Sequence, residues 1–306
     1  KDPQEFLQDV SFSQGKLRAI LKDKSGDRTF FVKLRDGRLS YWYPVCFQLV
    51  AVIQKEPAPL DLSAAEWEGK TFEPIDLSAY FNDQIGQIFK NKYLSPRPQT
   101  TTLQLPTQGI GDWPHPDAHP DINDAGLRAL AGTSNQIKLP SGLVWNSPSN
   151  PTAKNIIYTS QWDNYPKEVK IPVEGKASAV FFLLAGSTNP MQSRMDNGLI
   201  TVRYTDGTVD TLALRNPENW WPIEQDLYTD GFAFNTGADR PLRIHLKTGL
   251  IVPGNKGEEW NGKTIPGGAA TGLGIRLKKD KTLSEIKLST LSNDVVIGLI
   301  GITLLR

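Results

Sequence analysis

The sequence predicts an all-β protein, and three observations support this fold class. Residues 177–185 (ASAVFFLLA) are apolar over the length of a strand that is buried on both faces. Residues 199–204 and 209–214 follow as two strands, joined by an Asp206-Gly207 turn that supplies the positive φ angles of a tight hairpin. Proline and glycine are frequent (22 and 26 of 306 residues), and helical periodicity is nearly absent. These features favour an antiparallel β-sandwich or jelly roll.

The first 55 residues predict a short β-meander. Strands are expected at residues 17–21, 29–34, 39–43 and 45–53, with turn residues between them. Such a piece has little core of its own, so we expect it to pack against other protein. Residues 55–59 (KEPAP) are the expected linker, which divides the chain into a meander at 1–55 and a sandwich domain at 56–306.

The sandwich domain is expected to consist of many short strands separated by turns. A proline-rich loop is predicted at residues 109–123, and a short helical turn capped by Asn123 follows it. The final run, VVIGLIGITLL at 295–305, is apolar enough for a helix, but its glycines and β-branched residues favour a buried closing strand. The other expected strands lie at 71–77, 101–105, 137–139, 143–145, 156–159, 169–172, 240–246, 249–252, 273–277 and 283–291, with a glycine-rich segment at 266–274.

Composition excludes several classes of protein. The formal net charge is +1 with both signs mixed along the chain, so no basic stripe indicates a nucleic-acid partner. No run of about 18 apolar residues is present, so no membrane span is expected. The single cysteine, Cys46, lies in an apolar stretch and is interpreted as a small buried hydrophobe rather than a nucleophile.

Four stretches carry a resemblance to a known family. They are FEPIDLSAYFND, TTTLQLPTQGIGDW, VEGKASAVFFLLAGSTNPMQSRMDNGLITVRYTDGTVDTLALRNPENWWPIEQD and NDVVIGLIGITLLR. Together they resemble the C-terminal, galactose-binding-like β-sandwich region of large glycoside-hydrolase-like proteins of gut Bacteroidetes, a family of unknown function. The resemblance covers about residues 70–306.

The resemblance implies a jelly roll attached to an upstream catalytic domain of the same polypeptide, often an α/α toroid. Residues 1–55 would be the tail of a small β-domain that follows the toroid. Polysaccharide utilisation and a periplasmic or extracellular location are implied in the same way. The sandwich of this family type has no established catalytic residues, so none is assigned here.

The loop DWPHPDAHPD at residues 112–121 is the densest group of polar ligand types in the chain. One interpretation is a divalent cation site for calcium or zinc; the other is a surface loop ordered by its prolines. No other cofactor is expected. The candidate ligands are His115, Asp117, His119 and Asp121.

Paired carboxylates would be needed for glycoside hydrolysis. Nothing in the sequence selects a pair, and the usual motifs for nucleophile elbows, zinc helices, phosphate loops and dinucleotides are absent. The carboxylates considered are Asp112, Asp117, Asp121, Asp163, Asp196, Glu218, Glu224 and Asp226.

The eight tryptophans favour contact with carbohydrate over catalysis, because sugar rings stack on aromatic faces while neighbouring polar groups bind their hydroxyls. The alternative for each aromatic residue is burial between the sheets. The carbohydrate-binding candidates are Trp113, Trp162, Tyr165, Arg194, Asp196, Asn197, Trp220 and Trp221.

The sequence therefore predicts an accessory, non-catalytic sandwich of an extracytoplasmic glycoside hydrolase that supports the catalytic domain and binds glycan. Two alternatives remain open at this point. One is a glycoside hydrolase that acts through loop carboxylates, and the other is a purely structural interaction module.

Overall fold

The computed structural model describes most of the chain, and the chain divides into two compact units, Lys1–Glu56 and Pro57–Arg306. Among the described residues, no helix is long and apolar enough to cross a membrane. The described residues are 2, 3, 5, 7–14, 16–22, 26–36, 38–49, 60–91, 121–161, 165–188, 195–216, 218–224, 241–254, 265–293 and 295–306.

The first unit contains two separate antiparallel hairpins, not one continuous meander. Strand β1 (Leu7–Ser13) pairs with β2 (Lys16–Leu21), and β3 (Gly26–Asp36) pairs with β4 (Leu39–Leu49). The sequence predicts two strands, divided at Pro44, but β4 continues through this residue. A two-stranded sheet tolerates the proline because each strand has one edge that needs no hydrogen-bond donor. Cys46 lies in β4, and its side chain is outside the described part.

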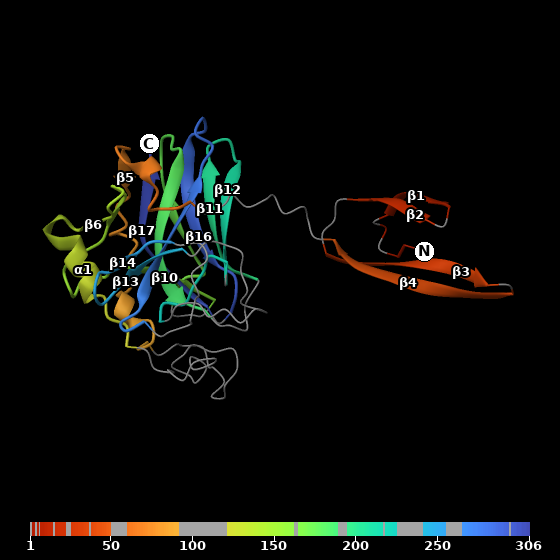
Figure 1. The fold of residues 1–306 in the computed structure, drawn as a ribbon, viewed down its shortest axis with the longest axis horizontal. Coiled ribbons are helices and arrows are strands. Elements are labelled where there is room, and N and C mark those ends of the chain that lie inside the picture. Colours follow the sequence, from red (N-terminus) through yellow and green to blue (C-terminus); the bar gives the residue numbers. More distant parts are fainter. Residues whose placement is uncertain are drawn as a thin grey trace. The chain divides into compact units, whose positions relative to one another are not determined.

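The second unit is an all-β sandwich, as the sequence predicts (Figure 1). Its helical elements are α1 (Ala125–Ala131) and the short turns η1 (Ala65–Trp67), η2 (Ile85–Gln87) and η4 (Gly132–Ser134). Its strands are β5 (Phe72–Pro74), β6 (Gln136–Lys138), β7 (Val144–Asn146), β8 (Ile157–Ser160), β9 (Glu168–Pro172), β10 (Ala179–Ser187), β11 (Asp196–Tyr204), β12 (Val209–Arg215), β13 (Leu242–His245), β14 (Ile251–Val252), β15 (Ala269–Arg276), β16 (Leu283–Thr290) and β17 (Val296–Leu305).

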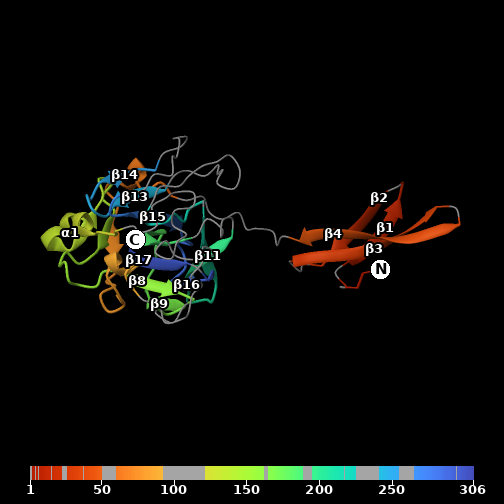
Figure 2. The ribbon, with the colours of Figure 1, turned by 90° about the horizontal axis from the view of Figure 1, so that it is seen from below.

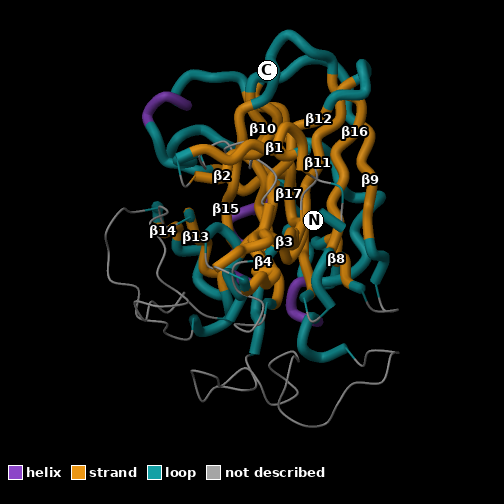
Figure 3. The backbone as a smooth tube through the Cα atoms, turned by 90° about the vertical axis from the view of Figure 1, so that its right-hand side faces the viewer, coloured by secondary structure: helices purple, strands orange, loops and turns teal. Residues whose placement is uncertain are grey.

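Two antiparallel sheets face each other. The large sheet has the order β14-β13-β15-β10-β17-β5, and β8 also pairs with β17. The small sheet has the order β12-β11-β16-β9, and Figure 3 shows these four strands running side by side. The β11–β12 hairpin is the one that the Asp206-Gly207 turn predicts: Gly207 has φ +83°, and Asp206 Oδ1 accepts a hydrogen bond from the Thr208 N–H at 2.9 Å.

The large sheet is buried on both faces, which explains the unbroken apolar run of β10. Val180, Phe182 and Leu184 point into the core between the two sheets. Phe181 and Leu183 point to the other side, into a second core beneath a covering layer made of α1, the β6–β7 hairpin and the segments of η1 and η2. Figure 2 shows α1 on one side of the large sheet and β9, β16 and β11 on the other.

The covering layer is tied to the large sheet by aromatic packing. The ring of Phe181 meets those of Trp67 and Phe72 edge-to-face, with centroids 5.2 and 5.8 Å apart. Each large apolar side chain buried in this way contributes about 1.5–3 kcal/mol. Trp145 of β7 is also fully buried and packs on Gly301 of β17, so the covering layer is fixed directly over the closing strand.

Three details differ from the sequence expectations or refine them. Strand β15 begins at Ala269, within the predicted glycine-rich segment 266–274, and Gly272 and Gly274 leave room for Leu62 and Phe181 against the sheet. The residues 295–305 form a strand, β17, as predicted. The N-cap of helix α1 is Asp124 and not the predicted Asn123, which precedes the cap and accepts the Ala125 N–H through Oδ1 at 3.0 Å. The strand expected at 101–105 lies outside the described residues.

Candidate binding site

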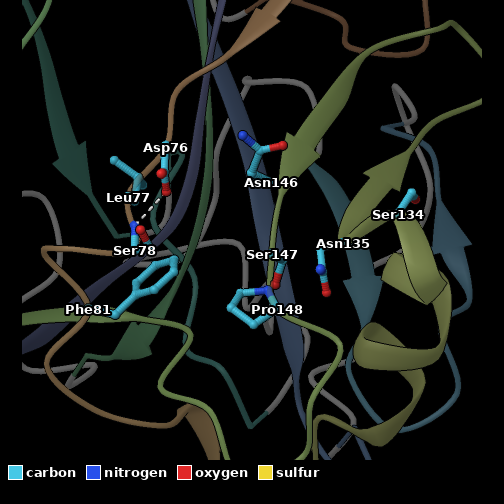
Figure 4. A pocket seen from close by; sticks show the side chains of 9 residues that line it. All are labelled: Asp76, Leu77, Ser78, Phe81, Ser134, Asn135, Asn146, Ser147 and Pro148. Atoms are coloured by element: carbon cyan, nitrogen blue, oxygen red, sulfur yellow. Dashed lines mark hydrogen bonds between the residues drawn. The ribbon is translucent and has the colours of Figure 1, made fainter.

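A pocket of about 280 Å³ lies where the covering layer meets the end of β5. Figure 4 shows Asp76, Ser78 and Phe81 on one side of the view and Ser147, Pro148 and Asn135 on the other. Three segments form it: residues 76–81, and residues 134–135 and 146–148, which lie at the two ends of the β6–β7 hairpin. Its lining residues are Asp76, Leu77, Ser78, Phe81, Ser134, Asn135, Asn146, Ser147 and Pro148.

The first segment is positioned by the closing strand. β5 pairs with the end of β17, and the Ile75 N–H donates to Ile302 O at 2.9 Å. The chain then turns, because the N–H groups of Tyr80 and Phe81 both donate to Leu77 O (2.9 and 3.2 Å). Leu77 itself is buried in the core between the sheets, so this wall of the pocket is anchored to the body of the sandwich.

Asp76 provides the negative charge of the pocket. The Ser78 N–H donates to Asp76 Oδ1 at 2.9 Å. This bond, and next the Ser78 hydroxyl, hold the pKa of the Asp76 carboxyl below its ordinary value, while burial opposes them. The carboxyl is therefore ionised at neutral pH. Among the nine described residues that line the pocket, it is the only charged group.

The second segment follows helix α1 and depends on Asn135. This residue adopts a left-handed conformation (φ 53°, ψ 36°), which asparagine tolerates better than most residues at the end of a helix. Its Oδ1 accepts hydrogen bonds from the N–H and the hydroxyl of Ser149, at 2.8 and 2.9 Å. Its backbone oxygen accepts the Ser147 N–H at 2.9 Å. Asn135 thus joins the second segment of the pocket to the third.

The third segment leaves strand β7 and carries a buried hydroxyl. Asn146 donates from Nδ2 to Pro74 O (3.4 Å), while its Oδ1 accepts from Gln136 (3.3 Å). Ser147 is 2% exposed, and its Oγ makes no hydrogen bond to any described residue. A buried hydroxyl without a partner costs about 1–3 kcal/mol. The Oγ has almost no accessible surface, so Ser147 shapes this wall of the pocket from beneath and does not offer its hydroxyl to a ligand.

Arg128 of α1 fixes the loop that carries Pro148. The arginine is 5% exposed, and its guanidinium donates to three backbone oxygens, those of Pro148 (3.3 Å), Asn150 and Ala153 (3.0 Å). Its Nε also donates to Asp124 Oδ2 at 2.9 Å. The side chain of Arg128 therefore ties the start of α1 to the loop that carries Pro148.

The chemistry of the pocket suits a polyhydroxylated ligand. It combines one carboxylate, two amide side chains and three hydroxyls with the apolar surfaces of Phe81 and Pro148. Hydroxyl groups of a ligand can donate to the carboxylate and amide oxygens, while the C–H face of a ring can contact the aromatic side chain.

No family model matches this chain, and no curated protein matches it either. The fold and the geometry of the pocket are therefore the structural basis for a proposed function.

The two adjacent tryptophans that the sequence suggests as sugar-stacking residues are both buried. Trp220 is 0% exposed and lies in the core between the sheets, where its ring reaches Gly186 of β10. Trp221 is 1% exposed, and the guanidinium of Arg243 lies 5.6 Å from its ring centroid. Hydrogen bonds of Asn219 with Arg215 and Ala213 close the turn that directs both rings inward. Neither ring presents a face to solvent in this structure.

Three other sugar-binding candidates are engaged in structural contacts. Asn197 is fully buried and accepts from the Thr188 hydroxyl, while its backbone oxygen accepts the Leu291 N–H at 2.9 Å. Asp196 forms an ion pair with Arg215.

Tyr165 is 8% exposed and donates its hydroxyl to Asp83 Oδ2 at 2.8 Å. The structure does not bring Tyr165, Asp196, Asn197 or the tryptophan pair into the pocket.

Half of the residues predicted to form a site lie outside the described part of the chain. Asp121, the one predicted metal ligand that is described, is exposed and pairs with Lys90 at 3.3 Å. Within the described ranges, no group of three or more histidine, cysteine or acidic side chains is placed to hold a metal ion. The residues outside the described part are Trp113, Trp162, Arg194, His115, Asp117 and His119.

The pocket was not predicted, because it brings residues 76–81 together with residues from both ends of the β6–β7 hairpin. Two local signals point to parts of it. Asp76 and Ser78 have the spacing of an Asx turn, in which the aspartate side chain accepts a hydrogen bond from the backbone N–H two residues later. Asn135 follows a short helix, and residues in the left-handed conformation are common at that position. No sequence signal marks Ser147, whose burial depends on β7 lying over β17.

Proposed function

We propose that this chain is an accessory, non-catalytic β-sandwich that binds glycan through the pocket at Asp76 and Ser147. The observation that carries the proposal is the pocket itself, whose lining combines an ionised carboxylate and amide side chains with an aromatic ring. In its finer form, the proposal is that the sandwich supports the catalytic domain of a periplasmic or extracellular glycoside hydrolase. The family resemblance of residues 70–306 motivates this finer form.

The composition of the pocket favours binding over hydrolysis. Glycoside hydrolysis needs two carboxyl groups, one on each side of the scissile bond. Asp76 is the single carboxyl group among the nine described lining residues, and its lowered pKa makes it a poor general acid at neutral pH. We therefore expect the pocket to retain a glycan without cleaving it.

A purely structural module is the second candidate. The burial of Trp220, Trp221 and Asn197 favours it, because side chains that could have contacted a sugar are used to hold the sandwich together. The two candidates differ in whether the purified chain retains a carbohydrate.

The test is a glycan array combined with a reducing-sugar assay on the purified chain. We expect retention of at least one glycan without release of reducing ends, and loss of retention in Asp76→Asn. The matched control is Asp280→Asn, since Asp280 is an exposed aspartate at a turn remote in sequence from the pocket segments. Release of reducing ends would show that the chain is a hydrolase. Absence of both binding and release for every glycan would favour the structural module.

A further inference from the structure

We propose that the β3–β4 hairpin binds the surface of an anionic lipid membrane through the half of the ribbon next to its turn. This half, residues 33–43, is called the turn end below. It belongs to the first unit, so the proposal is independent of the glycan pocket in the sandwich. The two faces of the ribbon carry it, because one is apolar and the other is basic.

The register of β3 and β4, the long hairpin in Figure 1, assigns each side chain to one of two faces. In an antiparallel pair, residues directly opposite each other lie on the same face, and the next pair along the ribbon lies on the other. Leu34 is opposite Tyr41, whereas Lys33 is opposite Trp42. The two faces therefore differ in chemistry. The apolar face carries Val32, Leu34, Leu39, Tyr41 and Tyr43, and the basic face carries Lys33, Arg35 and Trp42.

The apolar face is open to solvent at the turn end. Leu34, Tyr41 and Tyr43 are 39%, 53% and 56% exposed, and Leu39, which directly follows the turn, is 74% exposed. Farther from the turn the same face is covered, since Phe30 is only 8% exposed. Soluble proteins seldom leave a contiguous apolar strip of this kind in water, and such a strip is typical of an interaction surface.

The turn and the opposite face carry positive charge. Lys33 and Arg35 are exposed on the basic face, and Arg38 is exposed in the turn. Residues 33–38 (KLRDGR) contain three cations and one acid, so the turn end is cationic. The Lys33 ammonium also lies 5.8 Å from the centroid of the Trp42 ring. Charge complementarity therefore favours a negatively charged partner.

A lipid membrane accounts for both faces at once. An amphipathic element lies in the plane of the interface with its apolar face about 5–10 Å below the boundary between headgroups and acyl chains. Its basic face then lies near the lipid phosphates, which long Lys and Arg side chains reach readily. Tyrosine and tryptophan favour the same boundary, because each combines an apolar ring with a polar group.

Other partners use only one of the two faces. An acidic polysaccharide would pair with the cations and leave the apolar strip in water. A second copy of the chain, docked through the apolar strip, would leave the cations of the opposite face without a role.

The first experiment is co-sedimentation of the full chain with lipid vesicles. One set contains phosphatidylcholine alone, and the other contains phosphatidylcholine and phosphatidylglycerol at two parts to one. We expect the chain to bind the mixed vesicles at least tenfold more tightly, and this preference should decline at high salt because salt screens the attraction. Equal binding to both sets would overturn the proposal, as would absence of binding to either.

Two double variants assign the binding to the two faces. Lys33→Gln with Arg35→Gln should weaken binding to the mixed vesicles at least tenfold and change binding to phosphatidylcholine less than threefold, because these charges act on anionic lipid. Tyr41→Ser with Tyr43→Ser should weaken binding to both sets at least tenfold, because the apolar strip is lost.

Matched controls remove the same kinds of exposed side chain from the sandwich. They are Lys138→Gln with Lys154→Gln, and Leu250→Ser with Leu291→Ser, and both should bind vesicles like the wild type. The charge variant changes only exposed side chains of the hairpin, so it remains informative if the tyrosine variant misfolds. Wild-type binding in the charge variant would overturn the proposal.

Two further measurements identify the other partners. Sedimentation velocity without lipid would reveal a dimer, and a dimer that is lost in the tyrosine variant would assign the apolar face to a second copy. Binding to dextran sulfate without binding to vesicles would assign the basic face to an acidic polysaccharide. Either result would overturn the proposal.

Discussion

Arg128 shows how one buried side chain can hold a loop in place. Its planar guanidinium reaches the backbone oxygens of Pro148, Asn150 and Ala153 together with the carboxylate of Asp124. An arginine can satisfy four acceptors in different directions because it carries five N–H donors in a rigid fork. The loop that forms one wall of the pocket is therefore held by the chain itself.

Replacing Arg128 should destabilise the sandwich and loosen the pocket. Arg128→Ala removes a donor from three carbonyl oxygens and from the Asp124 carboxylate, which among the described residues keeps only the hydrogen bond from Asn155, at a cost of about 3 kcal/mol. Urea unfolding would measure this loss.

Lysine keeps the positive charge at this position but lacks the planar set of N–H donors of the guanidinium. We therefore expect Arg128→Lys to recover less than half of the stability lost in the alanine variant. If the lysine variant unfolded at the same urea concentration as the wild type, charge alone would account for the role of Arg128.

Tyr204 forms a second buried polar cluster, at the end of the β11–β12 hairpin. Its hydroxyl donates to Asp210, whose carboxylate also pairs with Lys278 at 2.8 Å. The Lys278 N–H donates to the same hydroxyl oxygen at 2.9 Å. Burial, and next the hydrogen bond to Asp210, raise the pKa of Tyr204 well above its ordinary value of 10.0.

The raised pKa of Tyr204 predicts a loss of stability in alkali. Below pH 10 the hydroxyl is protonated in both the folded and unfolded chains, so its contribution is complete. Above pH 10 the unfolded chain loses the proton first, and the stabilisation declines as the pH rises towards the folded pKa. Tyr204→Phe should cost about 1 kcal/mol at pH 8, and this deficit should shrink between pH 10 and 11.

Urea titrations of the wild type and Tyr204→Phe at each pH would measure the difference directly. Tyrosines whose pKa is the same in the folded and unfolded chains do not make the free energy of unfolding depend on pH. They therefore do not affect the difference between the two proteins. A deficit that stayed constant up to pH 11 would show that Tyr204 titrates normally.

At the scale of elements, β17 packs closely against its neighbours because two of its residues are glycines, which have no side chain. A Cβ at Gly301 would lie 2.8 Å from Trp145 Cβ, and one at Gly298 would lie 2.3 Å from Ala185 O. Only glycine allows β7 and β10 to approach this closely. The same two glycines argued against a helix from sequence, and the structure supplies the reason for their presence.

Gly301→Ala should therefore push β7 away from the sheet. We expect a loss of about 1–3 kcal/mol and weaker glycan binding, because Asn146 and Ser147 directly follow Trp145. Thermal unfolding and calorimetry would report the two effects. Gly69→Ala is the control: its φ of +69° brings strain, but no atom lies within 4 Å of the new methyl group, so binding should be unchanged.

The elements that the sequence predicts best are those with local signals. Strand β10 is recognisable from its apolar run, and the β11–β12 hairpin from Asp206-Gly207. Strand β4 was divided at Pro44, since the sequence does not reveal that its sheet has only two strands. The pocket could not be predicted, because it exists only once Asp76, Asn135 and Ser147 have been brought together by β5 and β7 packing on β17.

At the scale of the whole molecule, both hydrophobic cores of the sandwich lie within the second unit. Every residue of the two cores falls between Leu60 and Leu305. The hairpin unit instead exposes large apolar side chains, among them Phe12, Leu39 and Tyr43. This distribution predicts that the sandwich does not depend on the hairpins for its stability.

A shortened chain that contains residues 57–306 should have the same melting temperature as the full chain. Differential scanning calorimetry of both would test this, and the shortened chain should also be the more soluble because it lacks the exposed apolar side chains of the hairpins. A clearly lower melting temperature would mean that the first unit stabilises the second.

The position of β17 in the chain has a consequence for the order of folding. This strand pairs with β10, β8 and β5, which precede it by more than 100 residues. Pairings across such sequence separations are slow to form, since a long loop must close before any contact is gained. Until residues 296–305 have left the ribosome, β10, β8 and β5 lack their common neighbour and expose unpaired edges. We therefore expect the nascent sandwich to need protection from aggregation until β17 has emerged.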